Sequence, residues 1–286
     1  FLGNSGAEAN ECAIKLARKY SFDKYGEGRS TIISLQNSFH GRTLATLSAT
    51  GQDSFHQYFF PFMEGFVFAK AGDIDDLRSK AGGDVCAVML ECVQGEGGVI
   101  PLESSYLRAV RAFCDQRDIL LIVDEVQTGV GRTGRFLACE YSGIKPDIVT
   151  MAKGLGGGLP IGACLCNEKP ADVLSAGTHG STFGGPDGTQ IRKGASDAIQ
   201  NYVKEKGGSL PEDLEHHVNQ VAEKGGYMRE RLASMPNVRE VRGLGMMLGI
   251  VLEKGEAKPA AQECLKNGLL VLTAKTLLRL LPPLTI

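Results

Sequence analysis

The 286-residue chain is long enough to bury a large core and to form one large domain with a smaller one beside it. Its 31 basic and 33 acidic residues nearly balance, so its charge gives no support for a nucleic-acid partner or an anionic membrane surface. No apolar stretch reaches the length of a membrane span, so we expect no membrane partner.

Short apolar, β-rich runs alternate with stretches of helical periodicity through the first part of the chain. The spacing predicts strands over 30–35, 85–91, 118–125 and 146–152, and helices over 8–20 and 104–117. Continuous apolar strands separated by helices favour an α/β fold, in which a parallel sheet is covered on both faces.

The pattern changes after about residue 204, where a helix over 213–235 leads into several short strands. This second pattern is typical of a small α+β domain. We therefore place the large domain at 1–203 and the small domain at 204–286. The chain begins on Phe1 and stops within a predicted strand, so we interpret it as a piece of a longer protein, truncated at both ends.

The eight cysteines are scattered along the chain, and none forms a C-x-x-C pair. Most lie in apolar runs, which is typical of free thiols in a reducing compartment. We therefore expect a cytoplasmic protein without a metal site.

The turn in GNSGAEANE (3–11) supports two interpretations. Ser5 and Glu8 have the spacing of a capping box ahead of an amphipathic helix. The same turn, at Ser5, Gly6 and Ala7, can direct free backbone N–H groups and the helix dipole at an anion. Both interpretations can hold together.

Gly129, Gly131 and Gly134 match the G-x-G-x-x-G pattern of dinucleotide-binding proteins. We discount the match because Asp124 and Glu125 stand at the end of the preceding strand, where a pyrophosphate would be repelled. No clear helix follows the last glycine either. A nucleotide-binding oxidoreductase is therefore a remote alternative.

Asp124 directly follows the apolar run at 119–123, so we expect its carboxylate to be buried and to need a partner. That partner is either a structural arginine or helix N-terminus, or a cationic atom of a ligand. Lys153 follows one strand–helix–strand unit later, so two neighbouring strands would bring the acid and the amine to the same sheet edge.

A partly desolvated lysine at such an edge can act as a nucleophile toward carbonyl groups. The anion-binding turn, the buried acid and Lys153 together match the general pattern of a pyridoxal phosphate pocket. Taken by itself, Lys153 is also compatible with a solvated loop position.

Seven stretches, spread in order over nearly the whole chain, resemble one known family. They are NSGAEANE, SFHGRT, CVQGEGGV, DEVQTGVGRTG, MAKGLGGGLPIGA, THGSTFGG and RLLPPL. By these the chain resembles the class III aminotransferases, which are fold-type I pyridoxal phosphate enzymes, and most closely the members that act on N-acetylornithine. The resemblance implies a mostly parallel seven-stranded sheet flanked by helices, with a small α+β C-terminal domain.

The resemblance also implies the reaction. The ω-amino group of N-acetylornithine would pass to 2-oxoglutarate through a Schiff base of pyridoxal 5′-phosphate, a step of arginine biosynthesis. Ornithine, succinylornithine and 4-aminobutyrate remain alternative donors, because the same motifs fit all four.

A set of cofactor contacts follows from the resemblance, residue by residue. Lys153 would form the Schiff base, and Asp124 would keep the pyridine nitrogen protonated. The turn at Ser5, Gly6 and Ala7 would bind the phosphate. The remaining implied contacts are Phe39 and Val126 on the two ring faces, Gln127 at the ring oxygen and Thr182 at the phosphate of the neighbouring subunit. A contact between subunits implies a homodimer with shared active sites.

For the substrate, the resemblance implies that Arg42 and Arg279 bind carboxylates, which guanidinium groups hold bidentately. Arg279 would hold the α-carboxylate, and Glu96 would pair with Arg279 when that carboxylate lies elsewhere. One site could then accept both an amino donor and 2-oxoglutarate. We also place Ser181 in the substrate site.

Simpler interpretations of these side chains stay open. Phe39 could be plain core, Glu96 a solvated turn residue and Arg279 an edge-strand charge. We interpret His40 as a packing or supporting residue. Residues 186–202 depart from the family pattern, which leaves a non-catalytic interaction protein that retains the fold as an alternative. Retention of Lys153, Asp124 and Gln127 argues against this non-catalytic alternative.

Overall fold

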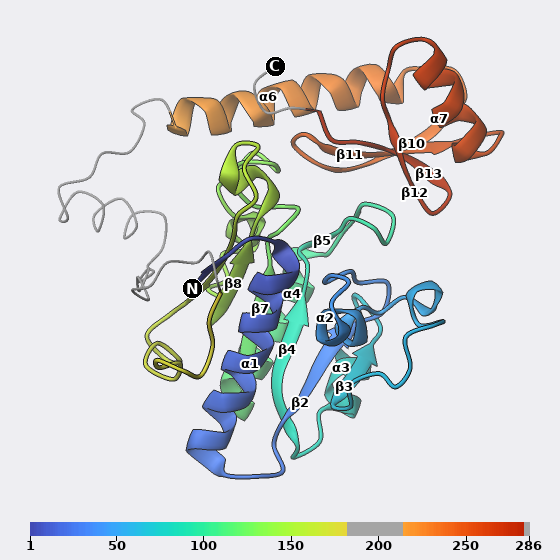
Figure 1. The fold of residues 1–286 in the computed structure, drawn as a ribbon. Helices are drawn as coiled ribbons and strands as arrows, with labels where there is room; N and C mark the ends of the chain where they lie inside the picture. The colour runs from blue at the N-terminus through green and yellow to red at the C-terminus, as the bar shows by residue number, and fades with distance from the viewer. Residues whose placement is uncertain (182–213, 283–286) are drawn as a thin grey trace.

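The computed structural model of the protein describes residues 1–181 and 214–282. Within them the chain forms a seven-stranded sheet and a separate four-stranded sheet, joined by a long helix and by loops (Figure 1). The predicted domain boundary at residue 203, the departing segment 186–202 and Thr182 lie outside the described residues.

The large sheet is mostly parallel. In sheet order its strands are β1 (Leu2–Gly3), β9 (Gly162–Cys166), β8 (Ile148–Met151), β7 (Leu120–Asp124), β4 (Val85–Leu90), β2 (Thr31–Leu35) and β3 (Phe66–Ala69). The five strands from β8 to β3 run parallel, whereas β9 is antiparallel to β8 and β1 to β9. The seven-stranded, mostly parallel sheet is confirmed, as are the four strands predicted from apolar runs.

Alternate side chains of the large sheet enter two different cores, because successive residues of a strand point to opposite faces. Ile32 packs with Ile14 and Leu16 on one face, and Ile33 packs with Val110 on the other. The first face is covered by α1 (Gly6–Tyr25) and α2 (Leu44–Ala49), and the second by α3 (Ile74–Lys80) and α4 (Ser104–Arg117). The predicted coverage of both faces is confirmed.

The connection between β7 and β8 differs from the predicted strand–helix–strand unit. It consists of turns and a short 3₁₀ helix, η2 (Ala138–Ser142). No α-helix starts at Gly134, which agrees with our rejection of a dinucleotide site. Gly134 instead has a packing role, since a Cβ there would lie 2.7 Å from Cβ of Ala222 at a φ of +87°.

The small sheet is antiparallel, with the strand order β10-β11-β13-β12. Its elements are α6 (Leu214–Ala233), β10 (Val238–Leu244), β11 (Met247–Leu252), α7 (Ala257–Lys266), β12 (Leu272–Ala274) and β13 (Leu277–Leu280). Figure 1 shows α6 extending from above the large sheet to the small one. None of the helices that the structure describes is both long and apolar enough to cross a membrane.

A hairpin of β5 (Val93–Gln94) and β6 (Ile100–Pro101) packs against one face of the small sheet. Val93 and Val99 share a buried cluster with Met247 and Leu277. This packing fixes the hairpin loop, and with it Glu96, next to β13.

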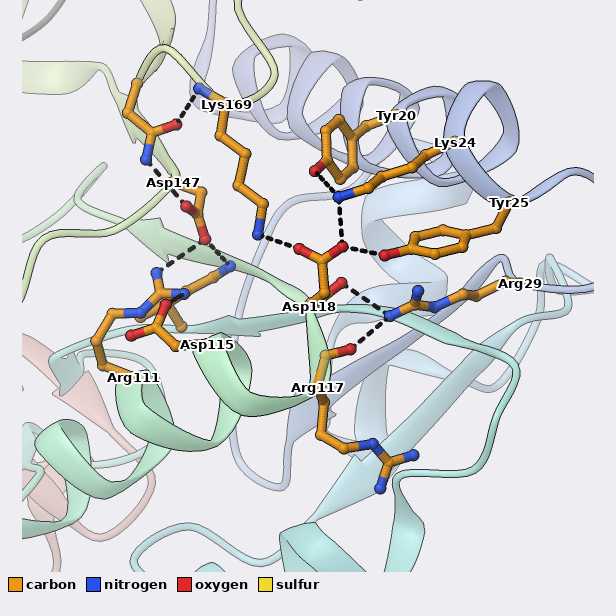
Figure 2. Close-up of polar contacts among 12 residues, drawn as sticks. Tyr20, Lys24, Tyr25, Arg29, Arg111, Asp115, Arg117, Asp118, Asp147 and Lys169 are labelled. Atoms are coloured by element: carbon orange, nitrogen blue, oxygen red, sulfur yellow. Dashed lines mark hydrogen bonds and ion pairs between the residues drawn. The ribbon is translucent and has the colours of Figure 1, made fainter.

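A polar network around Asp118 lies at the amino-terminal ends of the parallel strands of the large sheet (Figure 2). Asp118 ends α4 in the left-handed conformation, and Lys24 and Lys169 each place Nζ 2.6 Å from its carboxylate. The Tyr25 hydroxyl also donates to it. Partial burial acts to raise the pKa of Asp118, but these hydrogen bonds hold it well below its usual range. The network joins α1, α4 and the segment after β9.

Candidate active site

A cavity of about 540 Å³ opens at the carboxyl ends of the parallel strands, where ligands of such sheets bind. Most of the side chains that the sequence singles out line it, namely Ser5, Gly6, Ala7, Phe39, Arg42, Asp124, Val126, Gln127 and Lys153. Asn10, His40 and Glu91 line it as well. Glu96, Arg279 and Ser181 lie outside its lining.

The turn from β1 into α1 is built as a helix cap. Ser5 Oγ accepts a hydrogen bond from the Glu8 N–H at 3.2 Å. The return bond differs from a standard capping box, because the Glu8 carboxylate accepts from the Asn4 N–H at 2.8 Å. The first bond within the helix runs from the Ala9 N–H to the Ser5 oxygen. The N–H groups of Gly6 and Ala7 are therefore left for an anion, so both interpretations of the turn hold.

Two glycines keep this turn in place against its neighbours. A Cβ at Gly6 would lie 2.7 Å from Cγ1 of Val126, and a Cβ at Gly162 would lie 2.1 Å from the Ser5 carbonyl oxygen. The turn can approach β9 and Val126 so closely only because both positions lack a side chain.

Gly162→Ala should therefore displace the anion-binding turn. Because the added Cβ would meet a backbone oxygen, we expect about a tenfold loss of affinity for pyridoxal phosphate, measured by titration of the visible absorbance. Gly83→Ala is the matched control, since a Cβ there meets nothing within 4 Å. Equal cofactor affinity in the two variants would contradict this account of the turn.

Asp124 is 4 % exposed at the end of β7 and is bound by three donors. Its Oδ2 lies 2.8 Å from Asn10 Nδ2 and 2.8 Å from His40 Nδ1, and its Oδ1 accepts from the Val126 N–H at 3.0 Å. The structural partners are thus a histidine and an asparagine, and His40 has the supporting position that we expected. Three hydrogen bonds on one carboxylate fix its position at the cavity wall.

Lys153 lies just beyond β8, and its side chain opens into the cavity. Strand β8 pairs with β7 through Asp124 and Thr150, so the expectation that neighbouring strands bring the acid and the lysine to one edge is confirmed. Desolvation lowers the pKa of the Lys153 amine, while the negative charges of Asp124 and Glu91 oppose that change. Its backbone has a φ of +49°, which is unusual for a residue with a side chain.

Arg279 and Glu96 form an ion pair beside this cavity. Nη1 of Arg279 lies 2.7 Å from Glu96 Oε1 and 3.4 Å from Gln127 Oε1. Arg279 is 7 % exposed on β13, which lies between β11 and β12, so the edge-strand interpretation was wrong. Glu96 does lie in a turn, with its side chain 30% exposed, but its carboxylate is paired with Arg279. The buried Nε of Arg279 has no hydrogen-bond partner within the described part of the chain, so a further acceptor could use it.

Arg42 and Phe39 lie together at the cavity mouth. The Arg42 guanidinium is exposed and sits 5.4 Å from the centroid of the Phe39 ring. Phe39 is half-buried and lines the cavity, so it is not a plain core residue. Ser181 accepts a hydrogen bond from Asn4 Nδ2 at 3.3 Å, which places it beside the anion-binding turn.

Sequence reasoning missed Glu91, which is 3 % exposed at the end of β4. Its Oε2 accepts the Phe39 N–H at 2.9 Å. Burial raises the pKa of Glu91 to about 7, with His40 opposing the change and Asp124 adding to it. The signal was present, because Glu91 follows an apolar strand as Asp124 does. Asn10 was missed as well, being one polar residue within a helical apolar pattern.

Glu91 should make the cofactor-free protein less stable as the pH rises. A carboxyl whose folded pKa of about 7 exceeds its ordinary 4.5 stabilises the folded state below that ordinary value, and this stability is lost as the pH rises through 7. We expect Glu91→Gln to gain stability over the parent on the order of 2–3 kcal/mol between pH 5 and pH 8. Thermal unfolding at both pH values measures it, and an equal difference at the two would contradict it.

Comparison with known proteins places these features in a family. A family model described as aminotransferase class-III matches residues 1–286. The chain belongs to the class III aminotransferases, a family of pyridoxal phosphate-dependent transaminases that act on amino and keto acids.

Individual relatives agree with this assignment. The chain is 52% identical to the acetylornithine aminotransferase of Haemophilus ducreyi, covering 100% of this chain and 70% of that one. The N-acetylornithine aminotransferase structure from Stenotrophomonas maltophilia is 36% identical, with a TM-score of 0.74 over 100% of this chain and 69% of that one. An ornithine aminotransferase structure from Toxoplasma gondii, described with partial occupancy of PLP at its active site, is 30% identical. Its TM-score is 0.84, covering 100% of this chain and 68% of that one.

Proposed function

We propose that the protein transfers the ω-amino group of N-acetylornithine to 2-oxoglutarate with pyridoxal 5′-phosphate as cofactor. The observation that carries the proposal is the cavity that unites Lys153, Asp124 and the anion-binding turn, with the Glu96–Arg279 pair beside it. The names of the Haemophilus ducreyi and Stenotrophomonas maltophilia relatives support the choice of donor.

The residues present fit this cofactor group by group. The N–H groups of Gly6 and Ala7 would hold the phosphate, Val126 and Phe39 the two ring faces, and Gln127 the ring oxygen. Asp124 would pair with the ring nitrogen, because Asn10, His40 and the Val126 N–H hold its carboxylate at the cavity wall. When bound, pyridoxal phosphate supplies the electron sink for the carbon that loses its proton.

Lys153 is the group that would bond the cofactor and move protons. Desolvation favours its neutral amine, which is the nucleophilic form. With a donor in the cavity, the neutral Lys153 amine would be the base that takes the proton from the amine-bearing carbon of the donor.

The Glu96–Arg279 pair would let one site accept two dissimilar substrates. The carbon that bears the ω-amino group of the donor has no carboxylate, so Glu96 neutralises Arg279 while the donor reacts. The reacting carbon of 2-oxoglutarate does carry a carboxylate, which would take the place of Glu96 on Arg279. Arg42, exposed at the cavity mouth, would hold the distal carboxylate of either substrate.

Arg279→Lys should separate the two half-reactions. A lysine retains the charge but loses the bidentate fork, so we expect KM for 2-oxoglutarate to rise about 10–100-fold, with little change in the donor half-reaction. Single-turnover absorbance measurements separate the halves. Arg242→Lys, at an exposed pair with Glu240, is the control. Equal losses in both half-reactions would argue against the exchange.

We also propose a homodimer with shared active sites, located in the cytoplasm. Tyr58, Phe59 and Phe60 are 80%, 56% and 70% exposed, and such a group of apolar side chains supports a subunit interface. The intersubunit contact through Thr182 remains a prediction. None of the eight cysteines, all of which the structure describes, forms a disulfide, and this supports a reducing compartment. Sedimentation or light scattering of the cofactor-loaded protein tests the dimer, and a monomer at active concentrations would overturn it.

Borohydride reduction of the protein loaded with pyridoxal phosphate tests the function. We expect a visible absorption band and a reduced pyridoxyl adduct on Lys153, located by peptide mass spectrometry. The absence of any adduct would favour the non-catalytic alternative. A panel of N-acetylornithine, ornithine, succinylornithine and 4-aminobutyrate then identifies the donor, and activity confined to 4-aminobutyrate would overturn our choice.

A further inference from the structure

Three parallel strands, not two, end at the candidate cofactor cavity with an ionisable side chain. Strand β4 pairs with β7 through Leu90 and Val123, so the next residues along the two strands, Glu91 and Asp124, stand level with each other. Side chains at paired positions of neighbouring parallel strands point to the same face. Glu91 therefore faces the same cavity as Asp124, and it is part of the lining.

One hydrogen bond of the Glu91 carboxyl leads to the cofactor site. Its Oε2 accepts the backbone N–H of Phe39 at 2.9 Å. Phe39 lines the cavity, and the next residue, His40, bonds Asp124. The carboxyl of Glu91 therefore anchors the segment that carries both the ring-facing aromatic and a partner of the essential acid.

We propose that Glu91 is a positioning residue of this pocket, which anchors Phe39 through its backbone and faces the Lys153 amine with a second carboxylate. The proposal rests on the function proposed above, because the role of Phe39 and Lys153 depends on it. The proposal does not require the carboxyl group of Glu91 itself to react.

The charged groups around Glu91 come from each element packed against it. His40 lies in the loop after β2, Asp124 at the end of β7 and Lys153 beyond β8. Glu96 and Arg279 also act on the Lys153 amine, with opposite signs. Asp124 and Glu91 both favour the ammonium form of Lys153, Asp124 more strongly than Glu91. Asp124 is also bound by Asn10 and His40.

Two substitutions distinguish the anchoring of Phe39 from the effect of the Glu91 charge on Lys153. Glu91→Gln retains an acceptor for the Phe39 N–H but removes the charge, whereas Glu91→Ala removes both. Glu125→Gln is a matched control, because Glu125 is a fully buried neighbour of Asp124 whose pKa burial also raises. The carboxylate of Glu125 is bound by Thr128 and by the Cys139 N–H, and Glu125 does not line the cavity.

The first measurement uses cofactor-free protein. The pH dependence of Lys153 acetylation, followed by peptide mass spectrometry, should show a midpoint about one pH unit lower in Glu91→Gln, because a negative charge that favours the ammonium form is gone. The parent and Glu125→Gln should share one midpoint. An unshifted Glu91→Gln, or an equal shift in Glu125→Gln, overturns the proposal.

The second measurement uses cofactor-loaded protein. We expect the affinity for pyridoxal phosphate to fall about tenfold in Glu91→Ala, because the Phe39 N–H loses its acceptor, and to stay near the parent value in Glu91→Gln. Equal affinity for pyridoxal phosphate in the parent, Glu91→Ala and Glu91→Gln overturns the anchoring role. A parent protein without a borohydride-trapped adduct would instead refute the proposed function, and the acetylation midpoints would still decide the effect of Glu91 on Lys153.

Discussion

Lys153→Ala should lower the turnover of N-acetylornithine with 2-oxoglutarate by about 10⁴-fold, because it removes the side chain that we propose as both nucleophile and proton carrier. The variant should still bind pyridoxal phosphate non-covalently, since the phosphate turn, Asp124 and the ring-facing side chains remain. Steady-state turnover and a cofactor titration measure the two effects separately.

Lys145→Ala is the matched control for that variant. Lys145 precedes β8 as Lys153 follows it, and its side chain is exposed far from the cavity lining. Its loss should leave turnover unchanged. Near-normal turnover in Lys153→Ala would refute the proposed mechanism, whatever the donor.

Asp124→Asn should lower turnover by about 10²–10³-fold, because the residue that we propose to face the ring nitrogen would be a neutral amide. The substitution is nearly isosteric, but an amide cannot accept all the donors that Asn10, His40 and the Val126 N–H direct at this position. Part of the loss should therefore appear as weaker cofactor binding, which spectral titration resolves from the loss in turnover.

A second buried aspartate serves as the control for a purely structural effect. Asp147 is as little exposed as Asp124, but it pairs with Arg111 at 2.8 Å and accepts the Leu121 N–H, away from the cavity. Asp147→Asn should cost about 1–3 kcal/mol of stability while each folded, cofactor-loaded molecule keeps its turnover. Comparable losses of turnover in the two variants would assign Asp124 a structural role only.

The predictable part of the fold follows from strong local signals. The strands ending at Asp124 and before Lys153 are continuous apolar runs, which buried parallel strands require, and their order along the chain gave the correct sheet edge. Strands β3 and β9 were not predicted, and β9 is interrupted by small side chains. The helix predicted between β7 and β8 does not form, because the glycine-rich segment there packs its backbone against α6.

Only the site residues that directly follow a strong strand signal could be predicted from the sequence pattern. Asp124 and Lys153 each follow a buried strand, but the pairing of Glu96 with Arg279 joins a hairpin loop to a strand of the small sheet, and only the resemblance pointed to it. The contact from Glu91 to the Phe39 N–H depends on a loop conformation, which periodicity does not encode. Similarly, two of the three donors on Asp124, Asn10 and His40, come from a helix and a loop far away in sequence.

The left-handed backbone of Lys153 sets stability against activity at a single position. A side chain at a φ of +49° costs the folded protein on the order of 1 kcal/mol, which glycine would not cost. Selection for heat resistance alone would therefore favour replacing the lysine that the reaction needs. Engineering of this chain for thermal tolerance must keep position 153 fixed and find its gains elsewhere.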